Sequence, residues 1–571
     1  MHATEKTGYP SIDKPWLKYY STNEQNVAFE KKTIFDFAWE RNKDNLSGIA
    51  FEYFGKKTTY DTFFDKVKRT AASLYSIGIR KDDVVTIASM HIPEAVILIY
   101  ALNYLGAVSN IVYLTLSEKE LEDSITNTGS KLLAALDIVI DKAVSVAIKM
   151  GIPLVSMSCA DSMPELLRSL YKIKNKCKVN LYRNHYRFTD LIKKGSLDKV
   201  EKTDTPDSSA VIVYTSGSTG VPKGVMLSSH MINSVAIQAI HGLVDFKRGE
   251  KILYILPPFV GIGIVHLHMM LSVGLDMILH IDLTPEKIIK ELFKKRPYAF
   301  MGGPALVESF LKHKSLNLSH LRYFVGGGGS ITDQQIHDVN EKLKECGSEA
   351  IYANSYGMTE ASASLCYSNN DINRIGSVGV PHWGVNVKVV EPHIQREMQF
   401  GEIGELLFTG PQIMMGYYQN EEETANTLID DREGIKWLKT GDLGYVDEDG
   451  YVYITGRIKR IYITKDKDGV VYKLFPQRIE ELLKSVKNVS ECATVVIEDK
   501  DKINVAVAFT TLLKTDEDSK EKTLKLMQSR IESELPEHMR PVRIEIISIF
   551  PTTPSGKVDY RHLENYLKDE K

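Results

Sequence analysis

The sequence predicts an α/β protein, in which a large N-terminal domain of helix-covered sheets is followed by a small α+β domain. The chain has 571 residues, 43% of them hydrophobic, which exceeds the usual size of one compact domain. Between residues 33 and 136, helical patterns such as YDTFFDKVKRTAASLYSIGI alternate with short β-rich runs such as VVTIASM, as expected of parallel sheets covered by helices. The last ~110 residues instead carry the mixed helix and strand order of a small α+β domain.

Between these parts, residues 376–455 are rich in glycine, aromatic and β-branched residues, which indicates a small β unit. A turn is expected at Asp449-Gly450, between two strands. In the C-terminal part, Ile479, Leu482, Leu483 and Val486 follow helical spacing and predict one apolar helix face. The charged stretch 514–522 reads as a linker.

Charge and cysteine usage exclude several classes of protein. The formal net charge is −3, from 71 Lys and Arg against 74 Asp and Glu, and no long basic run suggests a nucleic-acid partner. The five cysteines lie far apart with no C-x-x-C pair, so neither a disulfide framework nor a zinc site is indicated. The first residues, MHATEKTGYPSIDKPW, lack the apolar stretch of a signal peptide. These features predict a cytoplasmic protein.

Two uncharged stretches, 95–117 and 252–275, are long enough to be candidate membrane segments. Polar residues and glycine interrupt the first, and its pattern predicts a buried helix over 93–105 that turns at Gly106 into a strand. Two prolines and three glycines break the second. Both stretches therefore favour a buried α/β core, and no transmembrane segment is expected.

Residues 214–225, YTSGSTGVPKGV, form a loop suited to holding phosphate after an apolar run. Hydroxyl side chains offer donors, glycines let backbone N–H groups approach an anion, and one lysine adds a mobile positive charge. These residues are Thr215, Ser216, Ser218 and Thr219, then Gly217, Gly220 and Gly224, and Lys223. The spacing is not that of a Walker A loop. A flexible surface loop is the plain alternative for this stretch taken alone.

Four further motifs follow in order along the chain. A glycine run at 326–329 ends a strand and allows the backbone close to a flat ligand. The motif NSYGMTE ends at Glu360, KTGDLGYVDEDGYVYITGRIKR covers 439–460, and PTTPSGKVDY covers 551–560. With the phosphate loop, these strings resemble the motifs of the acyl-adenylate-forming superfamily, which includes acyl-CoA synthetases, peptide-synthetase adenylation domains and luciferases. The resemblance covers essentially the whole chain.

The resemblance implies a nucleotide site and a role for each matching residue. Tyr356 stacks on adenine opposite the glycine run, Asp442 accepts hydrogen bonds from the ribose hydroxyls, and Arg457 reaches ribose or phosphate. Glu360, with Thr215, holds Mg²⁺, and Thr359 contacts phosphate. Lys557 enters the cleft and bridges the substrate carboxylate and the α-phosphate. The remaining implied contacts of ATP and coenzyme A are Gly328, Gly329, Ser355, Gly357, Lys459 and Gly469.

The resemblance also implies a mobile C-terminal domain. Residues 1–456 form the ATP- and acid-binding domain, 457–460 the hinge, and 461–571 the domain that carries Lys557. Rotation about Lys459 exchanges Lys557 for a thiol channel. The loop ITKDKDGVVYKLFPQRIE departs from the family's usual short form by extra Lys and Asp residues before Gly469 and by Leu474-Phe475 ahead of Pro476.

The implied reaction is ATP-dependent formation of an acyl adenylate and pyrophosphate, followed by transfer of the acyl group to the thiol of coenzyme A. The pantetheine arm of an acyl or peptidyl carrier protein is an alternative acceptor. Amino-acid-activating relatives place an aspartate in the pocket helix, whereas PPFVGIGIVHLH at 257–268 has no carboxylate. An apolar pocket fits an alkyl or aryl tail. A fatty acid is therefore expected, with an aryl acid as the alternative.

Overall fold

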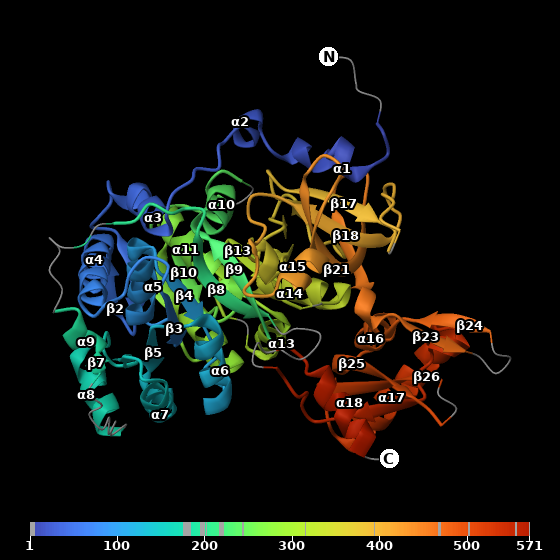
Figure 1. The fold of residues 1–571 in the computed structure, drawn as a ribbon. Coiled ribbons are helices and arrows are strands. Elements are labelled where there is room, and N and C mark those ends of the chain that lie inside the picture. The colour runs from blue at the N-terminus through green and yellow to red at the C-terminus, as the bar shows by residue number, and fades with distance from the viewer. Residues whose placement is uncertain are drawn as a thin grey trace.

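Two large sheets form the frame of the N-terminal domain in the computed structural model (Figure 1). The model describes residues 6–174, 184–193, 200, 202–215, 222–242, 245–314, 316–329, 331–392, 394–465, 470–500, 503–553 and 557–569. The nine-stranded sheet runs in the order β16 (Val380–Pro381), β15 (Cys366–Tyr367), β14 (Tyr352–Tyr356), β13 (Tyr323–Gly326), β12 (Ala299–Gly302), β10 (Lys251–Tyr254), β11 (Asp276–Leu279), β1 (Ile49–Tyr53) and β2 (Lys56–Thr59). The eight-stranded sheet runs in the order β19 (Gly416–Tyr417), β9 (Lys223–Ser228), β8 (Ser209–Thr215), β4 (Val108–Ile111), β3 (Val84–Ala88), β5 (Leu132–Leu136), β6 (Leu154–Met157) and β7 (His185–Arg187).

Parallel pairing dominates the centre of both sheets, and the antiparallel pairs lie towards their edges. Helices cover the strands: α4 (Tyr60–Ser76), α6 (Glu118–Thr128) and α7 (Ile140–Met150) come from the first half, and α12 (Pro285–Lys295), α13 (Pro304–Lys312) and α14 (Asp333–Glu345) from the second (Figure 1). The predicted α/β class is therefore confirmed.

Three apolar helices fill the core between the sheets. They are α5 (Pro93–Leu105), α10 (Ser229–Ile240) and α11 (Gly261–Val273), and nearly every residue of α5 and α11 is buried. A helix that is apolar on all sides has to be buried on all sides. Gly106 and Gly274 end α5 and α11 in the left-handed conformation, at φ 72° and φ 90°. Both uncharged stretches are thus core elements as predicted. Within the described part of the chain, no helix is long and apolar enough to cross a membrane.

A five-stranded antiparallel sheet forms the predicted β unit. Its strands are β17 (Asn386–Val390), β18 (Gly404–Thr409), β21 (Lys436–Val446) and β20 (Leu428–Asp430), with β22 (Val452–Arg457) paired to β21. The expected turn is present, because Gly450 lies at φ 94° between β21 and β22. A Cβ at Gly450 would lie 2.6 Å from the backbone nitrogen of buried Trp16, so only glycine fits there.

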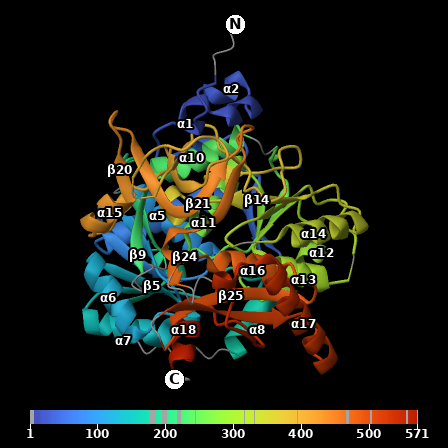
Figure 2. The same cartoon turned by 90° about the vertical axis from the view of Figure 1, so that its right-hand side faces the viewer.

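The C-terminal domain is small and follows directly on β22. The 3₁₀ turn η5 (Ile458–Arg460) leads to the hairpin β23 (Tyr462–Lys465) and β24 (Val471–Leu474), then to the sheet β25 (Val489–Glu498), β26 (Asn504–Leu512) and β27 (Arg543–Ile546). Helices α16 (Pro476–Lys484), α17 (Glu517–Glu534) and α18 (Tyr560–Asp569) accompany these strands. Figure 2 shows this domain below the strands of the five-stranded sheet.

The expectation of a charged linker over 514–522 is wrong, because α17 already begins at Glu517. Asp516 caps the helix by accepting a hydrogen bond from the Ser519 backbone, and Lys522 pairs with Asp518 one turn earlier. Charged residues at this spacing stabilise an exposed helix. The predicted apolar face of α16 is confirmed, since Ile479, Leu483 and Val486 are buried.

Candidate active site

The β8–β9 hairpin brings Thr215 and Lys223 together at the start of the phosphate-type loop. The two residues are register partners across the hairpin, and the end of β8 packs against the 3₁₀ turn η4 (Thr359–Ala361). Ser216, Gly217, Ser218, Thr219 and Gly220 lie outside the described residues. The hairpin therefore places Thr215 and Lys223 side by side, on strands that lie close to the turn that contains Glu360.

Lys223 is held by two side chains that the sequence did not indicate. Its ammonium forms an ion pair with Glu423 of α15 (Glu421–Thr427) and lies 5.0 Å from the centroid of the Tyr417 ring. Tyr417 in turn donates a hydrogen bond of 2.9 Å to Glu360 Oε1. This contact links the loop lysine to the buried carboxylate. The pairing of β19 with β9 positions Tyr417 for both interactions.

The glycine run lies tightly against β14. A Cβ at Gly327 would lie 2.8 Å from Ser355 Oγ, and one at Gly329 would lie 3.1 Å from Pro304 Cγ. Gly328 has φ +80°, a conformation that favours glycine. Ser355 Oγ donates to the carbonyl oxygen of Gly326 at 2.7 Å. The run is thus fixed beside the strand that ends at Tyr356.

Asp442 is the most buried acidic side chain of the site. It is 3% exposed, accepts a hydrogen bond of 2.5 Å from Tyr356 Oη, and pairs with Arg457 Nε at 2.8 Å. Burial raises the pKa of this carboxyl, whereas the charge of Arg457 and the hydrogen bond from Tyr356 lower it. An aromatic ring, a carboxylate and a guanidinium therefore converge at one place, as the sequence predicts.

The turn after Tyr356 packs against the beginning of α11. A Cβ at Gly357 would lie 2.3 Å from the Ala363 carbonyl oxygen, so the turn closes tightly on itself. A Cβ at Gly261 would lie 2.8 Å from Thr359 Cγ2. Thr359 is thereby placed against the beginning of α11, next to buried Glu360.

Lys557 reaches this site from the C-terminal domain. Its backbone pairs with Thr553, whose N–H donates to the Lys557 carbonyl oxygen at 2.7 Å. Although Lys557 is exposed at the protein surface, desolvation lowers the pKa of its ammonium, and the charge of Arg457 lowers it further. Asp442 and Glu360 act in the opposite direction. Lys557 is therefore a cation of the C-terminal domain whose charge interacts with those of Asp442 and Glu360.

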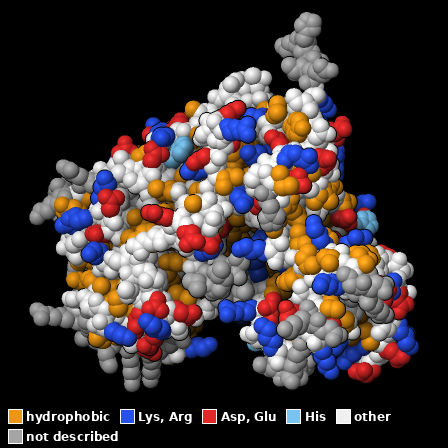
Figure 3. All heavy atoms as spheres, turned by 45° about the vertical axis from the view of Figure 1, so that its right-hand side comes forward, with side chains coloured by type: hydrophobic (Ala, Val, Ile, Leu, Met, Phe, Trp, Pro, Cys, Tyr) orange, Lys and Arg blue, Asp and Glu red, His pale blue; other side chains and the backbone are white. Residues whose placement is uncertain are grey.

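The two domains meet around these residues. Figure 3 shows a hollow between the N-terminal body and the C-terminal domain, with Lys and Arg side chains at its edge. Lys459 lies in η5, where the chain passes from one domain to the other, and its charge interacts with Glu423. Gly469 lies outside the described residues.

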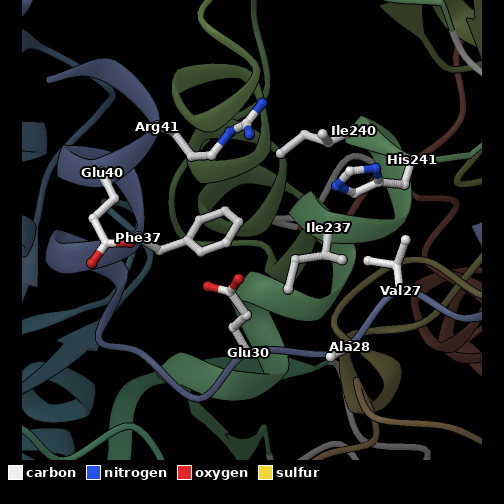
Figure 4. A pocket seen from close by; sticks show the side chains of 9 residues that line it. All are labelled: Val27, Ala28, Glu30, Phe37, Glu40, Arg41, Ile237, Ile240 and His241. Atoms are coloured by element: carbon white, nitrogen blue, oxygen red, sulfur yellow. The ribbon is translucent and has the colours of Figure 1, made fainter. Parts of the chain in front are cut away.

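A separate cavity of about 200 Å³ lies between α3 (Ile34–Asn42) and the end of α10 (Figure 4). Phe37, Ile237 and Ile240 give it an apolar wall, and Glu30, Arg41 and His241 stand around it. None of its lining residues belongs to the predicted nucleotide site.

Two family models and many curated proteins match this chain. The family model described as AMP-binding enzyme matches residues 37–418, and the model for its C-terminal domain matches 478–557. A long-chain-fatty-acid–CoA ligase of Bacillus subtilis is 28% identical, over 96% of this chain and 97% of that protein. The 4-coumarate–CoA ligase 3 of Arabidopsis thaliana is 27% identical, over 90% and 87%.

Solved structures share the fold. A crystal structure of ATP-bound MatB from Rhodopseudomonas palustris has a TM-score of 0.79 at 24% identity, covering 94% of this chain and 99% of that one. The anthranilate CoA ligase AuaEII in complex with anthranoyl-AMP has a TM-score of 0.81 at 18% identity, covering 96% and 100%.

Proposed function

Because this chain belongs to the AMP-binding enzyme family, whose model spans residues 37–418, we propose that it is an acid–thiol ligase that activates a carboxylic acid with ATP. The observation that carries the proposal is the convergence of Lys223, Glu360, Asp442 and Lys557, which come from distant parts of the chain. Two acidic and two basic side chains brought together in this way suit the binding of a nucleoside triphosphate and a carboxylate.

In the first half-reaction, an oxygen of the substrate carboxylate attacks the α-phosphorus of ATP. A new P–O bond forms, the bond from the α-phosphorus to the bridging oxygen breaks, and pyrophosphate leaves with the electron pair. The Tyr356 face receives adenine, Asp442 accepts hydrogen bonds from the ribose hydroxyls, and Arg457 and Thr359 reach ribose and phosphate. Gly328, Gly329, Ser355 and Gly357 shape the adenine wall. Lys557 stabilises the charge that grows on the non-bridging oxygens.

The residues present fit a magnesium ion carried by ATP. Glu360 supplies a buried carboxylate, and Thr215, whose strand packs against η4, supplies a hydroxyl. In the described part of the chain, no group of three or more His, Cys, Asp or Glu could hold a metal ion alone. This suits Mg²⁺, which usually takes one or two protein oxygens besides phosphates and water. When bound, the ion would neutralise charge on the phosphates.

In the second half-reaction, the thiol sulfur of coenzyme A attacks the acyl carbonyl carbon, loses its proton, and displaces AMP. We place the domain boundary at residues 456 and 461, with 457–460 as the hinge, because η5 joins β22 to the C-terminal strands. Rotation about Lys459 would withdraw Lys557 and bring the thiol channel, with Gly469, to the adenylate.

Two acyl acceptors and two kinds of acid substrate are compatible with the proposed function. A carrier-protein pantetheine arm would use the same ATP site as free coenzyme A. The B. subtilis relative's name supports a fatty acid, whereas the 4-coumarate and 2-succinylbenzoate ligases among the relatives support an aryl acid. A cytoplasmic location fits the four described cysteines, all of which are free and buried.

The test is an acid panel assayed for pyrophosphate release, with coenzyme A present and absent. Acid-dependent formation of AMP and pyrophosphate is expected, and ADP as the main product would contradict the proposal. Along a straight-chain series, each buried methylene contributes about 0.8 kcal/mol, so kcat/KM should rise roughly fourfold per carbon until the pocket is filled. A flat series, with an aryl acid well ahead, would replace the fatty-acid assignment and leave the adenylation chemistry intact.

A further inference from the structure

The cavity between α3 and the end of α10 combines an apolar wall with two opposite charges (Figure 4). Phe37 of α3 and Ile237 and Ile240 of α10 provide the apolar wall. Arg41 of α3 and Glu30, from the segment that leads into α3, line the same cavity. Its volume is about 200 Å³, and a cavity of about 150 Å³ can hold a molecule of the size of benzene. The cavity is therefore large enough for a small organic molecule that has both an apolar part and charged groups.

Contacts within the protein hold the chain on both sides of Glu30. The ring of Phe29 stacks on that of Trp383, with the two centroids 4.5 Å apart. The Lys32 carbonyl oxygen accepts a hydrogen bond of 2.8 Å from Asn233 Nδ2 of α10. Glu30 Oε2 pairs with Lys32 at 2.6 Å, yet 53% of the Glu30 side chain is accessible. This carboxylate is thus held at the cavity and is open to a second cation.

The end of α3, which carries Arg41, is held in a similar way. Arg248 Nη2 donates to the Arg41 carbonyl oxygen at 2.7 Å, and Arg248 Nη1 donates to Asn42 Oδ1 at 2.6 Å. Among the described residues, the guanidinium of Arg41 has no ion-pair partner. Partial desolvation and the charge of Arg248 lower the pKa of Arg41, whereas the charge of Glu30 raises it. A guanidinium that is partly removed from water with no anion in contact favours the binding of a carboxylate.

The charges around the cavity balance each other. Lys32 pairs with both Glu30 and Glu40, so Lys32 and Arg41 together offset the two carboxylates. Partial desolvation and the charge of Arg41 lower the pKa of His241, which is therefore neutral at pH 7. A purely anionic ligand would face the carboxylates of Glu30 and Glu40, and a purely cationic ligand would face Arg41. A ligand that carries both charges complements such a cavity.

We propose that this cavity binds a small α-amino acid with an apolar side chain. Its carboxylate pairs with Arg41, its ammonium pairs with Glu30, and its side chain packs against Phe37 and the end of α10. The amino acid is a second ligand and is not the acid that the enzyme activates, because the cavity shares no residue with the predicted nucleotide site. Branched aliphatic and aromatic amino acids present the same chemistry, and the experiment distinguishes them.

The test is equilibrium dialysis of the full chain with radiolabelled leucine and, separately, with radiolabelled phenylalanine. At least one of the two should bind, with one molecule per chain. Unlabelled analogues then compete with leucine: 4-methylpentanoate lacks the ammonium, 3-methylbutylamine lacks the carboxylate, and alanine lacks most of the apolar part. For phenylalanine, 3-phenylpropanoate and 2-phenylethylamine take the place of the first two. Each analogue should compete about tenfold more weakly or worse, because it loses one charged contact or its apolar contact.

Variants of the two charged residues assign the binding to this cavity. Arg41→Gln and Glu30→Gln each remove one charge and should weaken binding of the amino acid by about tenfold or more. Arg69→Gln, which changes an exposed arginine of α4 that pairs with Asp65, is the control and should leave the affinity unchanged. Lys557→Ala should also leave the affinity unchanged, because Lys557 is not among the residues that line the cavity. The thermal unfolding midpoint of each variant without ligand shows whether it is folded.

Several results would overturn the inference. They are binding of neither amino acid, analogues that compete as well as the parent amino acid, or full affinity in Arg41→Gln and Glu30→Gln. Loss of binding in Lys557→Ala would place the amino acid in the predicted nucleotide site and would overturn it as well. If both glutamine variants fail to fold, the competition series decides alone. The inference and the proposed function fail separately, because the dialysis needs neither ATP nor the formation of pyrophosphate.

Discussion

The predicted nucleotide half of the site and the predicted acid half, beside α11, differ in how their polar groups are satisfied. Asp442 is held by Tyr356 and Arg457, and Lys223 by Glu423. In the part of the chain that the structure describes, His266 of α11 and Gln238 of α10 keep buried polar atoms without a protein partner. Ion pairs and hydrogen bonds within the protein therefore hold the residues of the predicted nucleotide half in place, whereas the polar groups beside α11 are only partly satisfied by the protein.

Lys557→Ala should produce the largest effect, because the proposed mechanism places Lys557 in the nucleotide half during the first half-reaction only. Removing one charge partner of a transition state typically costs about 10²- to 10³-fold, so acid-dependent pyrophosphate release should fall by that factor. Thioester formation from a supplied acyl adenylate should largely survive. Lys568→Ala, an exposed change on α18, is the control. Equal loss of both half-reactions would contradict alternation of the domains.

Asp442→Asn should come next, because it removes a charged acceptor that the fold has already desolvated. Hydrogen bonds to charged groups contribute about 1.5–3 kcal/mol, so KM for ATP should rise about 10- to 100-fold. The same change removes the negative charge that pairs with Arg457 and weakens the hydrogen bond from Tyr356. Initial rates over a range of ATP concentrations measure the effect, and Asp430→Asn, at an exposed position on β20, serves as the control. An unchanged KM would remove Asp442 from the ribose site.

The parts of the fold that the sequence predicts best are those that local patterns determine. The buried helices α5 and α11 are all-apolar runs that end at a glycine, and α16 has one apolar face. Asp442 and Arg457 could be expected together, because the Asp449-Gly450 turn folds β22 back on β21 and makes them register partners. The start of α17 was missed although Asp516 is a helix cap, because its charged residues resemble a linker.

Contacts between distant segments could not be predicted in the same way. Glu423 meets Lys223 across 200 residues, and Tyr417 meets Glu360 across 57. Nothing local distinguishes Glu423 from the exposed Glu421 and Glu422 beside it. In the acid half, the stretch 257–268 has no carboxylate, and its two histidines give no local sign of their partners. The contact of His268 with Tyr100 and the approach of His266 to His382 appear only in the folded chain.

The pH dependence of adenylation tests whether Lys557 acts as a charged group in the nucleotide half. Lys557 must be charged to act, and desolvation together with Arg457 lowers its pKa. The charged form is therefore lost at lower pH than for an ordinary lysine. With saturating acid, kcat/KM for ATP should fall as pH rises through that lowered pKa, by at most about tenfold per pH unit. Lys557→Arg keeps its charge and should shift the fall in kcat/KM to higher pH. If the pH at which kcat/KM falls does not change, the fall is due to another group.

Glu423→Gln should have the smallest effect. Whether KM for ATP falls or rises in this variant shows whether the Glu423–Lys223 ion pair opposes or supports ATP binding. The hydrogen bond from Lys223 and its charge lower the pKa of Glu423, so Glu423 would compete with phosphate for this lysine in the proposed site. The pair is partly exposed, with 14% and 34% of the two side chains accessible, and such pairs contribute about 0.2–1 kcal/mol. Removing the competition should lower KM for ATP about threefold, which corresponds to ~0.7 kcal/mol. The exposed neighbour Glu422→Gln should leave KM unchanged. If Glu423→Gln instead raises KM for ATP, Glu423 holds Lys223 in its binding position, and the ion pair belongs to the ATP-bound enzyme as well as to the free one.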